Sequence, residues 1–550
     1  MKLSFRAGAA ALMLSAGILC GSCINVNKTL GESLIPDNQL YDIYTAEFPI
    51  EDIEQDMPDS LSGYNMYKFT FGALRDDTFG LTTRSTAFTL VPIADTLDFG
   101  KNAKFRQFHL SAVADSISYA DPTQQYILQN INVYELENPL NLSKLNPEIK
   151  YNRKRITDGV PVYNGMDSLS IDFSKEFGEK YMGITAADMD TITNYTKKFP
   201  GIYITTDVPA GNGGRINMFR LPISVNSGTI YGSYAELKFT ADYGDRKQVD
   251  TSFLFYLGPM TLYDLSGVKS TSVAKQTQIA YDMTTHSSKG LQGKAEKTIL
   301  MEGGKGLKPV IKAKDLRDKA LKEILKHTDD PKSIVVSKAS IILPFEFPDD
   351  YTEICKYPVA ISPTCRIATD TSVTFASLTD SSVSTEDQGD INRSLCIYSP
   401  DITHHAQELL KVGDDKISNY DIWILAMATE TVVAASSSSS SSYDDDYYNN
   451  LMYYNYYNNM YNGYGYGGYG YGYGGYGGYG GYGYNSLYNN YYNYGLLQSM
   501  YSTTSSSSYS TTKQSMMDNH RYYKAVFNGP KAEKNVPMFR IVYAIPKSGE

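Results

Sequence analysis

Tryptophan, histidine and cysteine are scarce in this chain of 550 residues, which contains 1 Trp, 6 His and 5 Cys. The sequence has no C-x-x-C pair and no H-E-x-x-H string, so the spacings of common zinc sites are missing. No segment reaches the 18 or so consecutive apolar residues that a transmembrane helix requires. We therefore predict that neither a metal site nor a transmembrane helix organises the mature protein, and we expect no cofactor.

An excess of basic residues is also missing. The chain has 50 Lys and Arg against 60 Asp and Glu, a net charge of −10 at pH 7 that is spread along the sequence. Proteins that bind nucleic acid usually carry a basic patch or stripe. The charge pattern therefore argues against a nucleic-acid partner.

An export signal is present at the start of the chain. Lys2 and Arg6 precede an apolar run over residues 7–19, which ends at Cys20-Gly21-Ser22-Cys23. This is the layout of a secretory signal, and the run is shorter than the roughly 20 residues that span a bilayer. We predict that residues 1–22 are a lipoprotein signal peptide that is cut after Ser22.

Cys23 is the predicted lipidation site. Lipoprotein processing requires small residues just before the modified cysteine, and Gly21 and Ser22 meet this need, whereas Cys20 follows two large residues. The position three before the modified cysteine usually holds Leu and here holds Cys20. Residues 23–40 then form a lipidated tether to the outer membrane. The alternative is an ordinary secreted protein with an incidental cysteine.

The rest of the chain has the pattern of many short β-strands. Apolar residues alternate with polar ones at Tyr44, Ala46, Phe48 and Ile50, and again at Tyr67, Phe69 and Phe71. Further strands are expected around 131–136, 234–239, 334–336, 341–345 and 539–543. We predict a mostly β protein of two tandem jelly-roll-like antiparallel sandwiches, over residues 41–268 and 269–550.

Two helices are expected in the second sandwich. Leu316, Ala320, Leu321, Ile324 and Leu325 form an apolar stripe on a segment whose other face is charged. The second helix follows Asp401, which is the predicted N-cap, and extends to Gly413.

Residues 436–513 have a biased composition of Ser, Tyr, Gly and Asn and hold nearly half of the 48 tyrosines. A segment of this kind cannot bury a core of its own. We predict a long disordered loop between two neighbouring strands, because the entropic cost of closing a loop grows slowly with its length. Tyrosines in such a loop suit stacking on sugars or contact with a partner, and a tolerated expansion is the alternative.

Several short strings resemble a lipoprotein family of the Bacteroidetes described as domain of unknown function 4270. They lie at residues 75–80, 132–136, 199–204, 303–306, 527–530 and 539–543. The resemblance implies export, a lipid anchor and mostly β structure, and it supplies no catalytic residues. Residues 401–403 with 420–424 are also similar to the late helix and strand of jelly-roll carbohydrate-binding modules, a likeness of fold alone.

The side of the outer membrane that the protein faces is also open to prediction. Surface-displayed lipoproteins of this bacterial group often carry acidic residues directly after the lipidated cysteine. Residues 24–30 contain none. We therefore favour the periplasmic face over the cell surface.

Three cysteines remain after Cys23, namely Cys355, Cys365 and Cys396. In an oxidising periplasm one pair can close a disulfide and leave one thiol. The sequence alone does not select among the pairs, and Cys355 with Cys365 is the candidate.

Each candidate active-site pattern also has a structural interpretation. His404 and His405 point about 100° apart on a helix, so we expect one to pack or cap and the other to face solvent. Gly303-Gly304-Lys305-Gly306 lacks the remaining P-loop residues, and Gly211-Asn212-Gly213-Gly214 lacks a dinucleotide-binding pattern, so both predict turns.

Acidic clusters at residues 51–56 and at Asp349-Asp350 have the residue types of a glycosidase, but no nucleophile, base and orienter combination emerges. We therefore expect a protein that is not an enzyme and that binds or organises another envelope component. A glycan-binding module with exposed tyrosines is the alternative, and a glycoside hydrolase is a more distant one.

Overall fold

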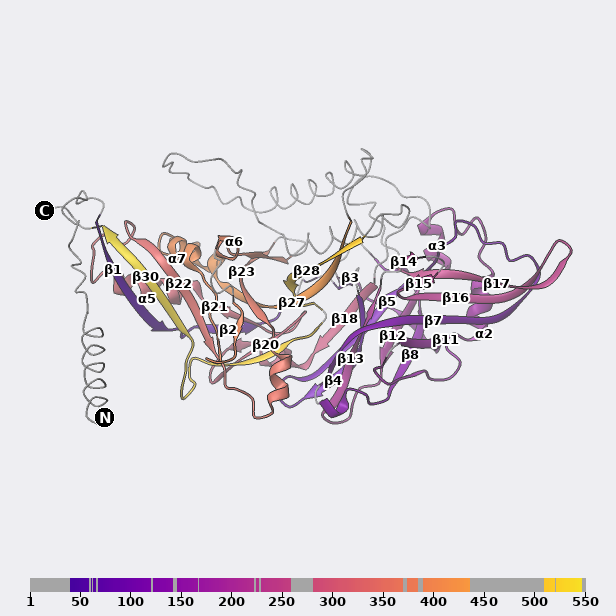
Figure 1. Cartoon of the computed structure of the whole chain (residues 1–550), viewed down its shortest axis with the longest axis horizontal. Coiled ribbons are helices and arrows are strands. Elements are labelled where there is room, and N and C mark those ends of the chain that lie inside the picture. Colours follow the sequence, from indigo (N-terminus) through magenta and orange to yellow (C-terminus); the bar gives the residue numbers. More distant parts are fainter. Residues whose placement is uncertain are drawn as a thin grey trace, which may run out of the picture.

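Antiparallel strands form most of the described chain, as the alternating sequence predicts. The computed structural model describes residues 40–58, 61, 63–65, 68–119, 122–141, 146–166, 168–221, 224–226, 229–258, 280–368, 373–383, 389–435, 509–519 and 521–546. Two hydrophobic cores lie one after the other along the long axis (Figure 1). We call the part around Phe69 to Ala280 the first lobe. The second lobe joins Ile50 and Ile53 to core residues from Ala295 to Ile545.

One large sheet builds the first lobe. Its strands are β3 (Tyr64–Asn65), β4 (Lys68–Asp76), β5 (Gly80–Phe88), β6 (Leu90–Pro92), β7 (Lys101–Tyr119), β8 (Gln129–Leu136), β9 (Tyr151–Arg155), β10 (Val162–Tyr163), β11 (Ser168–Asp172), β12 (Ile202–Thr206), β13 (Gly213–Arg220), β16 (Tyr234–Tyr243), β17 (Arg246–Leu257) and β18 (Ala280–His286). The main order is β10-β8-β12-β5-β4-β13-β7-β16-β17-β6, and β14 (Ser224–Asn226) and β15 (Thr229–Tyr231) form a separate pair. Helices α2 (Lys175–Met182) and α3 (Ile192–Lys198) add Tyr181 and Tyr195 to its core.

Smaller sheets build the second lobe. Its strands are β1 (Tyr41–Pro49), β2 (Ile53–Asp56), β19 (Gly293–Lys294), β20 (Thr298–Glu302), β21 (Lys308–Ile311), β22 (Val335–Pro344), β23 (Ala360–Ala368), β24 (Val373–Ser377), β25 (Ile391–Asn392), β26 (Ile397–Tyr398), β27 (Ile422–Ala435), β28 (Tyr509–Met517), β29 (Lys524–Asn528) and β30 (Met538–Pro546). They pair in the orders β1-β30-β22-β26-β25 and β19-β2-β21-β27-β23-β24, while β20 pairs with β29 and β28 pairs with β27.

The described part of the chain begins in the second lobe, builds the first lobe and then returns to the second. β1 pairs with β30 along its whole length, with Tyr41 opposite Pro546, and β2 pairs with β21 (Figure 1). β18 pairs with β5 of the first lobe. The pairing therefore cuts across a division into 41–268 and 269–550, because alternation identifies a half-buried strand but not the strand that it pairs with.

β4 departs from the half-buried strand that its sequence predicts. Phe69 and Phe71 pack in the first-lobe core, but Lys68 and Thr70 on the other face are also buried. Asp282 of β18 accepts hydrogen bonds from the backbone nitrogen and the hydroxyl of Thr70. The second face is therefore covered by polar contacts, which an apolar pattern does not reveal. Tyr67 lies outside the described residues.

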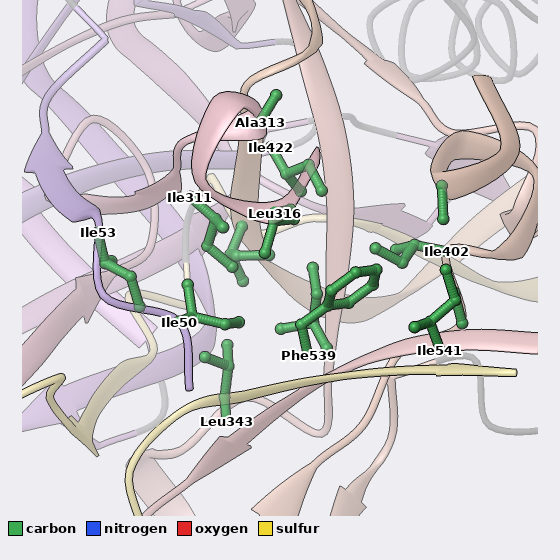
Figure 2. Packing of buried hydrophobic residues seen from close by; sticks show 14 of the residues in the cluster. Ile50, Ile53, Ile311, Ala313, Leu316, Leu343, Ile402, Ile422, Phe539 and Ile541 are labelled. Carbon is green, nitrogen blue, oxygen red and sulfur yellow. The ribbon is translucent and has the colours of Figure 1, made fainter. Parts of the chain in front are cut away.

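The second-lobe core brings together strands from both ends of the chain (Figure 2). Ile50 and Ile53 come from the start, and Phe539 and Ile541 come from the last strand. Helix α5 (Ala313–Ile324) packs Leu316, Ala320 and Ile324 into this core, as its stripe predicts. Leu325 follows the helix and is 54% exposed, so the stripe ends one residue early.

Helix α7 (Thr403–Leu409) is shorter than predicted and is capped differently. Asp401 accepts a hydrogen bond from the backbone nitrogen of Thr403, but the N-cap residue is Ile402. The backbone nitrogens of His404 and His405 donate to the carboxylate of Asp380, at 2.6 and 3.1 Å. The first turn is thus satisfied by a carboxylate of the short helix α6 (Asp380–Val383), a partner that a local sequence pattern cannot supply.

β27 and β28 form a ribbon at the base of the Tyr-rich tract. Ala435 pairs with Tyr509, so the intervening chain leaves and returns at one point of an antiparallel pair. Residues 509–513, which the sequence assigned to the loop, lie in β28. Residues 436–508 lie outside the described residues.

Candidate functional site: a buried polar junction between the lobes

Charged and polar side chains are buried where the two lobes meet. We call this cluster the polar junction and define it by Arg84, His286, Glu302, Lys308 and Tyr522. β5 carries Arg84, β18 ends at His286, β20 ends at Glu302, β21 begins at Lys308, and Tyr522 precedes β29. Burying charges in this number is unfavourable unless each one is paired or hydrogen-bonded.

Glu302 lies at the centre of the polar junction and is completely buried. One carboxylate oxygen accepts a hydrogen bond from the Tyr522 hydroxyl at 2.9 Å, and the other accepts from Ser288 at 2.5 Å and from the backbone nitrogen of Leu307. Burial opposes ionisation, but the contacts with His286, Lys524 and Ser288 outweigh it and hold the pKa of Glu302 below its usual range. Glu302 is therefore an ionised acceptor.

His286 lies beside this carboxylate and is neutral. Its Nδ1 is 2.7 Å from the Tyr522 hydroxyl and 3.5 Å from Glu302, while its buried Nε2 has no hydrogen-bond partner among the described residues. A proton on Nε2 would be an unsatisfied buried donor, so the neutral form with the proton on Nδ1 fits best. Burial lowers the pKa of His286, which agrees with this assignment.

Lys308 is fully buried next to Glu302. Its Nζ donates to the backbone carbonyls of Glu302 and Gly306, at 2.5 and 3.0 Å. Burial lowers its pKa to about 8, although Glu302 and Asp518 oppose the shift. Residues 303–306 form a turn between β20 and β21, as predicted. The two hydrogen bonds from Lys308 stabilise this turn, because they join its two ends.

Asp518 connects the turn to the segment that precedes β29. Its carboxylate accepts hydrogen bonds from the backbone nitrogens of Arg521, Tyr522 and Tyr523. Its own carbonyl accepts from the backbone nitrogen of Gly304 at 2.5 Å. The Tyr522 side chain is held in place by these backbone contacts.

Arg84 supplies the first-lobe side of the polar junction. Its Nη1 donates to the Thr70 hydroxyl at 3.3 Å, and its guanidinium lies 5.3 Å from the centre of the Tyr522 ring. Its Nε has no hydrogen-bond partner among the described residues. Burial raises the pKa of the neighbouring Asp282 to about 6, although Arg84 and two threonines oppose the rise.

The polar junction has residue types that serve acid–base catalysis, but its geometry favours a structural role. Glu302 is 0% exposed and Tyr522 is 3% exposed, so neither presents an atom to a substrate in this arrangement. The hydrogen bonds run from Thr82 and His286 through Tyr522 to Glu302, and therefore from one lobe to the other. The junction fastens the lobes together.

The predicted lipidation site, Cys23, and the predicted cleavage site, Ser22, lie outside the described residues. Cys355, Cys365 and Cys396 are free thiols in the structure, and burial raises the pKa of Cys365 to about 12. The pairing of Cys355 with Cys365 stays a prediction, which a count of free thiols in the exported protein would check.

The predicted histidine arrangement is confirmed. His404 is exposed, whereas His405 is buried with its Nε2 3.0 Å from the carbonyl oxygen of Tyr420. The turn predicted at residues 211–214 is confirmed only for residues 211–212, because Gly213 and Gly214 already belong to β13, where both have positive φ.

Three of the acidic residues in 51–56 contact lysines, and the fourth, Asp56, accepts a hydrogen bond from the Gln292 side chain at 2.6 Å. Glu51 pairs with Lys319, Asp52 with Lys294, and Glu54 with Lys312. Asp350 caps the 3₁₀ helix η6 (Tyr351–Lys356) by accepting from Thr352. These carboxylates therefore have structural partners in the second lobe.

Comparisons with protein-family models, with curated proteins and with solved structures gave no match. Within the described residues, no helix is long and apolar enough to cross a membrane. In the same part of the chain, no three residues among His, Cys, Asp and Glu are grouped to hold a metal ion.

Proposed function

We propose that this chain is a non-catalytic, lipid-anchored protein of the bacterial outer membrane that binds or organises another component of the cell envelope. The proposal includes lipidation at Cys23 after cleavage at Ser22, membership of the Bacteroidetes family named above, and two jelly-roll-like sandwiches as its body. Its partner is an envelope protein or a glycan.

One observation carries this proposal. The first described strand, β1, is paired with the last strand, β30, at one end of the long axis, and the β16–β17 hairpin lies at the opposite end (Figure 1). A lipid on Cys23 would hold the molecule by the β1 end through residues 24–40. Such a segment reaches at most about 60 Å when fully extended. The far end of the first lobe would then be the part most distant from the point of attachment, where a partner can reach it.

Replacement of Cys23 tests the anchor. We expect Cys23→Ser to abolish incorporation of labelled fatty acid and to move the protein from the membrane fraction to the soluble one. Cys20→Ser is the matched control and should keep both properties. Loss of the label in Cys20→Ser, with retention in Cys23→Ser, would refute the assignment.

Photo-crosslinking in cells tests the binding role. A photoreactive residue at Asp245, in the exposed turn between β16 and β17, should capture a defined envelope component. The same residue at Asp329, in the exposed segment after α5, is the control near the anchored end and should capture less. If neither position gives a crosslinked product and the protein stays monomeric, the result would contradict the proposal.

A glycan is the second candidate partner, and one feature of the first lobe favours it. Tyr134, Tyr151 and Tyr203 stack on the sheet face opposite the core, with ring centres 5.1 and 4.4 Å apart, and Tyr134 and Tyr151 are partly exposed. Asn132 on the same face donates to Asp207 at 3.0 Å. Aromatic rings beside fixed polar groups suit the apolar faces and hydroxyls of a sugar.

Affinity electrophoresis in polysaccharide gels tests this candidate. The double variant Tyr134→Ala with Tyr151→Ala should lose retardation. Tyr126→Ala is the matched control, because Tyr126 is 57% exposed and does not belong to this cluster. Equal retardation of all three proteins would exclude the sheet face as the sugar site.

A further inference from the structure

Lys305 and Asn146 meet at the surface of the contact between the lobes. Lys305 lies in the turn between β20 and β21 of the second lobe, and Asn146 lies between β8 and β9 of the first lobe. The Lys305 Nζ is 2.5 Å from the Asn146 Oδ1. The Nζ is therefore no more than about 3.7 Å from the carboxamide carbon, since the C=O bond adds about 1.2 Å. This is close to the distance at which an amine attacks a carbonyl.

Two further contacts hold the Asn146 carboxamide in place. The Tyr281 hydroxyl donates to the same Oδ1 at 3.3 Å, and the Asn146 Nδ2 donates to the backbone carbonyl of Leu61 at 3.1 Å. Burial raises the pKa of Tyr281 to about 12, so its hydroxyl keeps its proton. A donor fixed on a carbonyl oxygen stabilises the negative charge that develops there when a nucleophile adds to the carbon.

The turn also positions the lysine amine. The backbone nitrogen of Gly303 donates to the backbone carbonyl of Tyr523 at 2.7 Å, and Gly304 has a φ of 58°, a conformation that suits glycine. Burial and the neighbouring Arg84 lower the pKa of Lys305 to about 8, although Asp282 opposes them. About a tenth of the amine is therefore unprotonated at pH 7, and this neutral form is the one that nucleophilic attack requires.

We propose that Lys305 and Asn146 form an intramolecular isopeptide bond that joins the two lobes covalently. The neutral Lys305 Nζ adds to the Asn146 Cγ, after a rotation of the lysine side chain brings it over the face of the carboxamide. The Tyr281 hydroxyl stabilises the oxyanion. One proton passes from Nζ to Nδ2, the Cγ–Nδ2 bond breaks, and ammonia leaves. One amide replaces another, so nothing is oxidised or reduced.

Tandem mass spectrometry of the full mature protein tests the bond directly. After denaturation and digestion, we expect a branched peptide that joins the segments around residues 146 and 305. Its mass should be lower than the sum of the two linear peptides by one ammonia molecule. Recovery of both segments as linear peptides alone, from folded protein after prolonged incubation, would overturn the proposal.

Three variants separate the chemistry from folding. Lys305→Arg keeps the charge but removes the amine, and should abolish the branched peptide. Lys531→Arg is the matched control, because Lys531 forms an exposed ion pair with Glu296 and should leave the branched peptide intact. Tyr281→Phe should slow formation of the bond in a time course of refolded protein. Branched peptide at the wild-type rate in Tyr281→Phe would contradict the role of its hydroxyl.

Discussion

Several of the buried hydrogen bonds at the contact between the lobes end on one side chain, the carboxylate of Glu302. Its two carboxylate oxygens accept hydrogen bonds from the hydroxyls of Ser288 and Tyr522 and from a backbone nitrogen, and the side chain is fully buried. Removing one member of a buried charged network leaves the others unsatisfied, which costs more than the network contributes as a whole. The side chain is therefore more sensitive to substitution than exposed carboxylates are.

We expect Glu302→Gln to lower the free energy of unfolding by about 3 kcal/mol, in the range measured for broken buried ion pairs. The amide keeps the shape of the side chain but removes its charge and places a donor where hydroxyls already donate. Urea denaturation monitored by circular dichroism measures the change. Glu296→Gln, which alters an exposed ion pair, is the control and should unfold like the wild type. Equal stability of the two variants would show that the charge of Glu302 does not stabilise the polar junction.

His405 predicts a pH dependence of stability. Burial lowers its pKa to about 4, while an unfolded histidine titrates near 6.5. Below pH 6.5 the unfolded chain binds a proton that the folded chain does not. Stability should therefore fall as the pH drops from 6.5 to 4, by about 1.4 kcal/mol per pH unit for one group, and His286 should add to the slope.

The variant His405→Gln should make this profile less steep and leave the contribution of His286. Its amide nitrogen can still donate to the carbonyl of Tyr420, but it does not titrate. Urea midpoints between pH 4 and 8 measure the profile, and wild type and variant should run parallel above pH 7. His404→Gln, at the exposed neighbour, should keep the wild-type slope.

Residue-level prediction from sequence succeeds for side chains whose surroundings are local. The split between exposed His404 and buried His405 follows from helix geometry. The polar junction was missed, because its members lie on different strands and segments that only the tertiary fold brings together, and they match no motif. The one local signal was the turn at residues 303–306, which was correctly predicted as a turn but carries no information about its partners.

Elements show the same limit at a larger scale. The spacing of apolar residues in the sequence correctly predicts β1, β30 and α5, because each presents one apolar face to a core. It fails for the N-terminal turn of α7, since Asp380 reaches that turn through the tertiary fold. It also fails for β4, whose polar face is buried against Asp282.

The β27–β28 ribbon makes the Tyr-rich tract removable. Because Ala435 and Tyr509 are already paired, a short turn can replace residues 436–508 without moving either strand. Shortening a loop from 73 residues to four is roughly four halvings, each worth about 0.6 kcal/mol of closure entropy. We expect the free energy of unfolding to stay the same or to rise by up to about 2.4 kcal/mol, as measured by urea denaturation.

The same variant tests whether the tract binds glycans. If its tyrosines contact sugars, the replacement should abolish retention on polysaccharide while the protein remains folded. A tract of equal length with each tyrosine changed to serine is the control that separates side-chain contact from loop length. Retention by all three proteins would show that the tract is not the sugar-binding element.

At the scale of the whole molecule, the main feature is the pairing of the first described strand with the last one. β1 and β30 are paired at one end, so the proposed lipid anchor would hold the first described strand and the last strand together. Two cores with different memberships are joined by the polar junction rather than by a simple linker. This arrangement was not predicted from the sequence, because the pairing of the two ends leaves no trace in local periodicity.

If the protein is anchored in the outer membrane as proposed, the side of that membrane that it faces determines which partners it can meet. Residues 24–30 contain no acidic side chain, so we expect the mature protein to face the periplasm. Proteinase added to intact cells should leave the full-length band unchanged on an immunoblot, and permeabilised cells should lose it. Asn25→Asp with Asn27→Asp introduces the acidic residues typical of surface lipoproteins and should make the protein accessible in intact cells. Digestion of the wild type in intact cells would reverse the assignment and place the Tyr-rich tract in contact with the outside medium.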